Sequence, residues 1–324
     1  MLNPRNVTAS APGKTILFGE HAVVYGKPAI AAAVDKRVYV SIEEREDNRT
    51  HVKINELGIS GYLNIEKGTI ELDNSKKNEG ILKYVLIALI KTGSKDGLEI
   101  TINMDIPVGA GLGSSAAITV ATVKAASSFK NIELTSDEIA KLAHQIELMV
   151  QGSASPIDTI LSTYGGIVYL SRDAEEIIKL DIDSEIPLVI GYTSERGNTG
   201  KLVESVRLKM ETSPQVMIPL FNSMEALTNG AREALISGDH KMIGEFMNIN
   251  HGLLDAIGVN TDELSKMVYI ARKSGALGSK LTGAGGGGSM IAYCPGKVDI
   301  VMENINKIEK AFKVKISADG VRLE

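Results

Sequence analysis

Residues 106–117 read Ile-Pro-Val-Gly-Ala-Gly-Leu-Gly-Ser-Ser-Ala-Ala, and this stretch decides the fold. Before it, apolar and polar residues alternate strictly from Leu98 to Ile106, which is the pattern of a half-buried strand. After it, residues 114–121 are small or apolar and suit a helix packed closely on a sheet. The glycines let backbone N–H groups approach an anion, and the helix start adds partial positive charge. The sequence therefore predicts a phosphate-binding loop between a strand and a helix.

Two other phosphate-binding motifs fit the sequence less well. A P-loop requires G-x-x-x-x-G-K-[ST], and Thr8 stands where the first glycine before Gly13-Lys14-Thr15 is needed. A dinucleotide fingerprint, G-x-G-x-x-[GA], is matched from Gly111 to Ala116, with Glu133 about twenty residues further on. However, this loop begins far from a first strand–helix turn, and two serines open its helix. Their hydroxyls suit a metal-bound nucleoside triphosphate better, so a nicotinamide enzyme is the weaker alternative.

Composition is that of a soluble globular protein with room for two domains: 324 residues, 44% apolar and 23% charged. A net charge of −5 without a long basic run argues against nucleic acid as the main partner. The single cysteine, Cys294, excludes an intrachain disulfide and fits a reducing interior. Residues 1–10 do not read as a signal peptide, and the uncharged stretch 106–123 reads as core. We therefore expect a cytoplasmic protein that does not enter a membrane.

Along the chain, strands and helices alternate. Thr135-Ser136-Asp137-Glu138 is a capping box that opens a helix, and Glu147 lies on the shoulder of the apolar stripe of that helix. The charged stretch 172–185 predicts a domain boundary near residue 180. The other expected elements are strands at 38–42, 167–170, 289–293 and 314–317 and helices at 81–89, 216–236, 240–257, 261–274 and 298–312.

Two further segments accompany the glycine loop. Ser10–Ala22 places Lys14, Glu20 and His21 around two glycines, and Lys280–Gly288 is a glycine run before a strand. The three segments together resemble the signature segments of the GHMP kinases, the family of galactokinase, homoserine kinase, mevalonate kinase and phosphomevalonate kinase. The resemblance runs from about residue 7 to residue 295 and is closest to the archaeal type of mevalonate kinase.

The resemblance implies a fold and an activity. The implied fold is α+β (mixed α/β), with an ATP-binding domain at 1–180, a C-terminal domain at 181–324 and the active site in the cleft between them. The implied reaction uses ATP and Mg²⁺ to phosphorylate (R)-mevalonate to (R)-5-phosphomevalonate in isoprenoid biosynthesis, in an enzyme that forms homodimers. Two alternatives stay open. One is a sibling kinase for another mevalonate hydroxyl, phosphomevalonate or a sugar; the other is a catalytically silent nucleotide-binding relative.

The resemblance also implies where nucleotide and metal bind. Ser115 and Glu147 would hold Mg²⁺, which prefers a carboxylate, a hydroxyl and water as ligands. The alternatives are a helix cap for Ser115, with Ser114 able to exchange roles, and a partly exposed carboxylate with a lysine partner for Glu147. The residues expected to bind the ATP phosphates are Pro107, Val108, Gly109, Ala110, Gly111, Leu112, Gly113, Ser114, Ser115 and Ala116.

Asp158 and Lys14 are the expected catalytic residues. A carboxylate beside the accepting hydroxyl can orient it and take its proton, and an ammonium can stabilise the developing charge. An Asx turn is the alternative for Asp158. Many relatives have Ser-Gly-x-Asp here, whereas Pro156 stands in the glycine position and lacks an N–H donor. The residues expected to contact substrate are Lys14, Glu20, His21, Asp158, Thr199 and Gly283.

Overall fold

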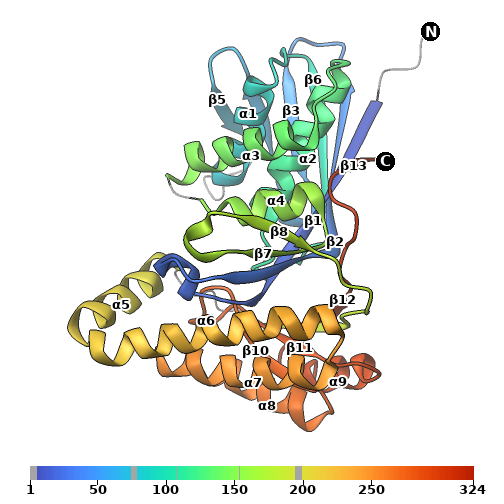
Figure 1. Ribbon diagram of the computed structural model, residues 1–324. Coiled ribbons are helices and arrows are strands. Elements are labelled where there is room, and N and C mark those ends of the chain that lie inside the picture. Colours follow the sequence, from blue (N-terminus) through green and yellow to red (C-terminus); the bar gives the residue numbers. More distant parts are fainter. Residues whose placement is uncertain (1–5, 74–78, 108, 153, 194–198) are drawn as a thin grey trace.

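The computed structural model describes residues 6–73, 79–107, 109–152, 154–193 and 199–324. Its strands form two sheets, one in each half of the molecule (Figure 1). The larger sheet contains β1 (Asn6–Phe18), β2 (Ala29–Glu44), β3 (Thr50–Ile54), β4 (Ile59–Asn64), β5 (Thr69–Leu72), β6 (Leu98–Met104), β7 (Ile167–Leu170), β8 (Ile177–Leu180) and β13 (Arg322–Leu323). The smaller sheet contains β9 (Leu188–Tyr192), β10 (Gly278–Thr282), β11 (Ser289–Tyr293) and β12 (Lys310–Val314).

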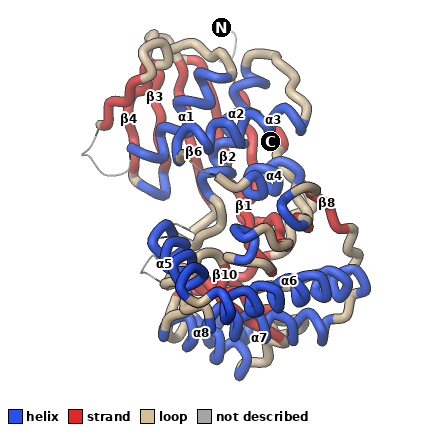
Figure 2. The backbone as a smooth tube through the Cα atoms, turned by 60° about the vertical axis from the view of Figure 1, so that its left-hand side comes forward, coloured by secondary structure: helices blue, strands red, loops and turns tan. Residues whose placement is uncertain are grey.

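The order of the larger sheet is β13-β1-β2-β6-β3-β4-β5. In addition, β7 pairs with β2, and β8 pairs with β7. The order of the smaller sheet is β10-β11-β9-β12. Each sheet is accompanied by its own group of helices (Figure 2). The helices are α1 (Glu79–Lys91), α2 (Ser114–Phe129), α3 (Ser136–Gln151), α4 (Pro156–Tyr164), α5 (Thr199–Thr212), α6 (Pro214–Ser237), α7 (His240–Ala256), α8 (Asp262–Lys273) and α9 (Val298–Ile305).

Helix α2 lies directly on β1 and β2, and α1 and α3 pack against it. Eleven of its sixteen residues are buried, namely all of Ala116 to Ser127 except Lys124. Most of them have small side chains, which allows the helix to approach the sheet closely. The predicted capping box begins α3: the Thr135 hydroxyl accepts from the Glu138 N–H, and the Glu138 carboxylate accepts from the Thr135 N–H. Helix α2, with the loop that precedes it, therefore lies on the sheet, and α3 packs on α2.

Two predicted elements near the C-terminus were wrong in extent. The helix expected at 298–312 ends at Ile305, and residues 310–314 form β12, an edge strand that pairs with β9. The strand expected at 314–317 is thus displaced toward the N-terminus. Pairing with β9 outweighs helix propensity here, because Asn306 caps the helix and also bonds both backbone groups of Ala311.

After β12 the chain returns to the larger sheet, where β13 pairs with β1. The domain boundary predicted near residue 180 would fall at the end of β8, and it remains a prediction. The chain is not divided cleanly there, because its last strand, β13, belongs to the larger sheet.

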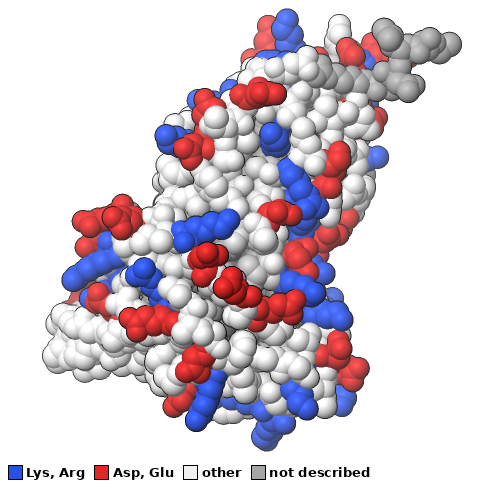
Figure 3. Space-filling model, turned by 45° about the vertical axis from the view of Figure 1, so that its right-hand side comes forward, with Lys and Arg blue, Asp and Glu red and all other residues white. Residues whose placement is uncertain are grey.

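On the face in Figure 3, Lys and Arg are interspersed with Asp and Glu. In the described part of the chain, no helix is long and apolar enough to cross a bilayer.

Arg37 binds the segment between β12 and β13 to β1. Its guanidinium, in a residue only 5% exposed, donates to the Ser10 hydroxyl at 2.7 Å and carbonyl at 3.0 Å, and to the carbonyls of Gly320 at 2.7 Å and Asp319 at 3.3 Å. Arg37→Met would leave these acceptors unsatisfied. We expect the free energy of unfolding to fall by about 2–4 kcal/mol in urea titrations. Arg172→Met, at a side chain 68% exposed, should change it by less than about 1 kcal/mol. Equal midpoints for the two variants would contradict this role.

Candidate active site

A cavity of about 570 Å³ lies where the two halves meet. Its walls come from β1 and the turn after it, the glycine loop before α2, the starts of α4 and α5, and the glycine run after β10. The predicted residues that line it are Lys14, Glu20, His21, Pro107, Gly109, Gly111, Leu112, Gly113, Ser114, Asp158, Thr199 and Gly283. Segments far apart in the sequence thus meet as expected. Ala110 and Ala116 are buried behind the loop instead, and Val108 lies outside the described residues.

Lys14 and Asp158 face each other across this cavity. The Lys14 ammonium lies 3.2 Å from Oδ1 of Asp158, and the two side chains are 11% and 28% exposed. Asp158 stands in the first turn of α4, and Pro156 occupies the first helical position, where a backbone N–H has no helical acceptor. The Ser155 hydroxyl caps this helix by accepting from the N–H of Ile157 at 3.4 Å. Proline is therefore compatible with the turn, and the carboxylate faces a lysine.

The glycine loop holds the lysine and opens α2 toward the cavity. The backbone N–H of Lys14 donates to the carbonyl of Leu112 at 2.9 Å, so β1 and the loop are fastened together. Gly113 is the N-cap of α2 with φ +67°, and a Cβ there would lie 2.9 Å from Cγ of Lys14. Only glycine fits where the backbone is left-handed and the lysine stem passes so close. The uncapped N–H groups at the start of α2 are thus available to an anion beside an ammonium.

Glu147 lies behind the serines of α2 and is only 3% exposed. Its Oε2 accepts from the Ser115 hydroxyl at 3.3 Å and from Gln151 Nε2 at 3.0 Å, and its Oε1 accepts from Thr119 at 3.4 Å. Burial, helped by the charge of Asp158, raises the pKa of Glu147 to about 7. The alternative of a partly exposed carboxylate paired with lysine is wrong, because the neighbours are hydroxyls and an amide.

These surroundings fit a divalent cation. A dry carboxylate near a second carboxylate is stabilised by positive charge. Among the described residues, no three His, Cys, Asp or Glu side chains gather as a metal cluster. A cation at Glu147 and Ser115 would therefore take its other ligands from phosphate oxygens and water, which is how Mg²⁺ is usually bound in phosphoryl transfer. Ser115 and Glu147 could hold the metal, and the carboxylate of Asp158 lies close enough to interact with its charge.

Three side chains around Glu147 were not predicted from the sequence. Thr119 and Gln151 bond to its carboxylate, and Tyr84 from α1 lies beside Gln151 and Ser115. Thr119 follows Ser115 by four residues and Gln151 follows Glu147 by four, so helical spacing could have indicated both. Nothing local in the sequence indicated Tyr84.

The turn after β1 is buried and joined to the second half of the chain. His21 is 6% exposed with φ +58°, and its Nε2 donates to the carbonyl of Ala284 at 2.8 Å. Burial lowers the pKa of His21 and so favours the neutral ring, in which Nδ1 is an acceptor because Nε2 carries the proton. Glu20 is 2% exposed and forms an ion pair with Lys280. The sequence predicted that Glu20 contacts substrate, and in the structure both oxygens of its carboxylate have protein partners.

The remaining two predicted substrate residues, Thr199 and Gly283, also border the cavity. Thr199 is the first residue of α5, and the residues before it, 194–198, lie outside the described part of the chain. Gly283 follows β10 with φ +79°, and no atom lies within 4 Å of where its Cβ would be. The position therefore opens onto the cavity.

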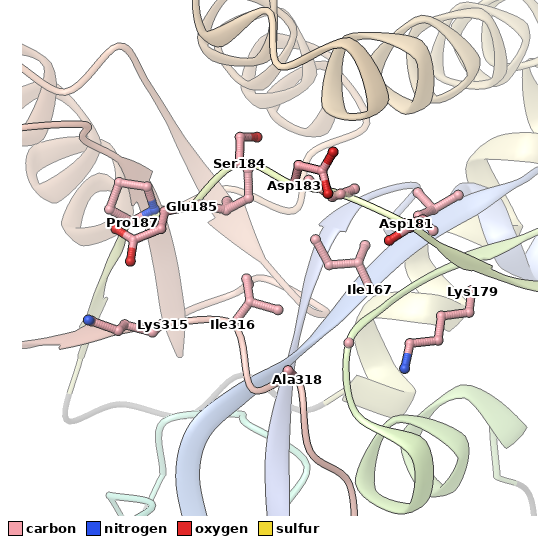
Figure 4. Close-up of a pocket in the computed structure, with 14 residues that line it drawn as sticks. Ile167, Lys179, Asp181, Asp183, Ser184, Glu185, Pro187, Lys315, Ile316 and Ala318 are labelled. Atoms are coloured by element: carbon pink, nitrogen blue, oxygen red, sulfur yellow. The ribbon is translucent and has the colours of Figure 1, made fainter.

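A second cavity of about 460 Å³ lies where β8 leaves the larger sheet. Figure 4 shows Ile167, Ile316 and Ala318 in its middle, with Lys179 and Asp181 toward one end. None of the predicted site residues lines it. The candidate active site is thus the cavity that contains Lys14 and Asp158.

Comparison with known proteins agrees with this geometry. The model of the GHMP kinases N terminal domain matches residues 80–166, and that of the GHMP kinases C terminal matches residues 231–310. The mevalonate kinase of Thermococcus sibiricus is 44% identical, with 98% of each chain covered. The crystal structure of the Methanococcus jannaschii mevalonate kinase has a TM-score of 0.84 at 33% identity and covers 97% of this chain and 99% of that one. L. major mevalonate kinase in complex with R-mevalonate also has a TM-score of 0.84, at 26% identity with 95% of each chain covered.

A two-part α/β architecture with a glycine loop and a lysine–aspartate pair defines a small-molecule kinase of the GHMP class, and the chain belongs to the GHMP kinase family. Relatives that are 44% identical over nearly the whole length include the mevalonate kinases of Thermococcus sibiricus and Pyrococcus abyssi. The family and the mixed α/β fold predicted from the sequence are confirmed.

Proposed function

We propose that this enzyme transfers the γ-phosphoryl group of ATP to the primary hydroxyl of (R)-mevalonate and so makes (R)-5-phosphomevalonate for isoprenoid biosynthesis. The observation that carries the proposal is the Lys14–Asp158 pair at 3.2 Å, facing a cavity that the start of α2 also borders. A candidate base and a candidate phosphate site thus border the same cavity. The full-length relatives that bear the name mevalonate kinase support the choice of acceptor.

In this proposal Asp158 accepts a hydrogen bond from the acceptor hydroxyl and takes its proton as the new bond forms. The hydroxyl oxygen attacks the γ-phosphorus, and the bond between that phosphorus and the β–γ bridging oxygen breaks. ADP leaves with the electron pair of the broken bond. Lys14 offsets the negative charge that develops between the acceptor and the phosphoryl group, and the N–H groups of α2 hold the remaining phosphates.

Magnesium is part of the proposal. Glu147 and Ser115 would hold Mg²⁺, which when bound neutralises charge on the phosphate oxygens. Thr119 and Gln151 keep the carboxylate of Glu147 in one orientation through their hydrogen bonds. Orienting a ligand in advance reduces the rearrangement that binding would otherwise require. His21 and Thr199 would contact the acceptor from the wall of the cavity.

The proposed function is tested by offering acceptors one at a time. The purified enzyme is given Mg-ATP with mevalonate, phosphomevalonate, galactose or homoserine, and ADP release is measured in a coupled assay. We expect saturable release with mevalonate and only background release with the other three. Release with another acceptor would assign the enzyme to a sibling activity. No release with any of them, together with measurable ATP binding, would contradict the kinase proposal.

Location and assembly follow the same resemblance. We place the enzyme in the cytoplasm, where ATP is supplied and a buried free thiol such as Cys294 stays reduced. A homodimer is the assembly common in the family, and light scattering on the eluting protein would test it against a monomer of 34.6 kDa.

A further inference from the structure

A buried ionic cluster lies directly beneath the candidate active site. Lys280 of β10 is fully buried, and its ammonium pairs with Oε1 of Glu20, whose side chain is 1% exposed. The second oxygen of Glu20 accepts from Nδ2 of Asn250, on α7, at 3.2 Å. Glu20 belongs to the first half of the chain, and Lys280 and Asn250 belong to the second. The cluster therefore joins the two halves at the floor of the cavity.

A second bond runs between the same two segments. His21 is the residue after Glu20, and its ring donates to the carbonyl of Ala284, four residues after Lys280. The two bonds close a ring through two short stretches of backbone, 20–21 and 280–284. Thr282 adds a third link, because its hydroxyl donates to the carbonyl of Ile16 at 2.9 Å. The ring therefore contains the Glu20–Lys280 pair together with His21 and Gly283, which line the cavity.

Stability alone does not explain such a pair. Burial lowers the pKa of Lys280, and the charge of Glu20 opposes that effect. Removing two charges from water costs about as much free energy as their attraction returns, so an apolar pair of similar size would stabilise the fold at least as well. His21 also holds φ +58°, a conformation that non-glycine residues adopt only when their surroundings impose it. An ionic bond at the preceding residue can impose it.

We propose that Lys280, with Asn250, is a positioning residue for the acceptor site: it holds Glu20 so that His21 and the glycine run keep the geometry that binds the acceptor. Glu20 then acts through its neighbour, and its carboxylate stays out of contact with the substrate. This inference rests on the proposed function, because the acceptor whose binding it governs is mevalonate.

The test uses Lys280→Met, Glu20→Gln and the double variant, with KM for mevalonate, KM for ATP and the melting temperature measured for each. Lys280→Met leaves the buried carboxylate of Glu20 without its ammonium partner, and Glu20→Gln leaves the buried ammonium of Lys280 without its carboxylate partner. The melting temperatures of both single variants should therefore fall. We expect KM for mevalonate to rise at least tenfold in each, with KM for ATP within twofold of wild type. In the double variant the melting temperature should recover, because neither charge remains, while KM for mevalonate stays raised.

Lys27→Met is the matched control. Lys27 pairs with Glu225 of α6 at 2.6 Å and also joins the two halves, but it does not border the cavity. Its KM for mevalonate should equal that of wild type. A double variant in which KM for mevalonate recovers together with the melting temperature would overturn the positioning role, as would a folded Lys280→Met with wild-type KM. If Lys280→Met fails to fold, Glu20→Gln and the double variant decide. Absence of mevalonate turnover in wild type would contradict the proposed function itself.

Discussion

Asp158→Asn should lower kcat by about 10²–10⁴-fold, the contribution typical of a general base. The amide has the same shape, and its oxygen can still accept a hydrogen bond from Lys14, so the pair at 3.2 Å should survive. What is lost is the ability to take the proton of the acceptor hydroxyl. We therefore expect ATP affinity, measured by calorimetry, to stay within a factor of about two of wild type, since 1.4 kcal/mol would be needed for a tenfold change.

The matched control is Asp262→Asn. Asp262 also stands in the first turn of a helix, α8, and it is exposed and does not line the cavity. Its kcat should equal that of wild type. If Asp158→Asn lost ATP affinity as strongly as it lost turnover, Asp158 would be a nucleotide-binding or folding residue. Turnover near the wild-type level would exclude it as the base.

Glu147→Gln should raise the Mg²⁺ concentration needed for half-maximal ATP binding at least tenfold, which corresponds to about 1.4 kcal/mol. Glutamine keeps the size of the side chain and one acceptor oxygen for Ser115 or Gln151, but it lacks the negative charge that Mg²⁺ prefers. The measurement is a magnesium titration of ATP binding, which does not depend on turnover. Glu133→Gln, at an exposed glutamate two residues before the capping box, should leave the titration unchanged.

Although Glu147→Gln should weaken magnesium binding, we expect it not to lower the stability of the metal-free protein. The pKa of Glu147 is about 7 in the folded protein against an ordinary value of 4.5, so the folded state binds the proton more tightly. Stability therefore falls as the pH rises from about 4.5 to about 7, and the whole penalty is present above that range. At pH 8 without magnesium, Glu147→Gln should melt at or above the wild-type temperature. A magnesium titration equal to wild type, or a large drop in melting temperature at pH 8, would contradict the ligand role.

Features that depend on neighbouring residues in the chain could be predicted from the sequence. The alternation from Leu98 onward, the glycines before α2 and the capping box at Thr135 each involve residues a few positions apart. Their physical causes are local: side-chain period, left-handed backbone and end-capping hydrogen bonds. The family resemblance then extended these local features to the Lys14–Asp158 pair and to the fold, because the motifs and their order both matched.

Contacts between distant residues could not be predicted in this way. Glu20 and Lys280 are 260 positions apart, and a lysine before a glycine run gives no sign that its charge is buried. Tyr84 shows only the apolar spacing of a helix, although its hydroxyl reaches the neighbours of Glu147. The helix expected to reach residue 312 was wrong for a related reason, because pairing of β12 with a distant strand overrides local propensity.

The most direct test of the central claim is the identity of the product. The enzyme is incubated with Mg-ATP and (R)-mevalonate, and the phosphorylated product is examined by phosphorus NMR with proton coupling. We expect one phosphate ester whose phosphorus couples to the two protons of the C5 methylene group. A phosphorus signal without methylene coupling would place the phosphate on the tertiary hydroxyl and contradict the account, as would the absence of any new phosphate ester.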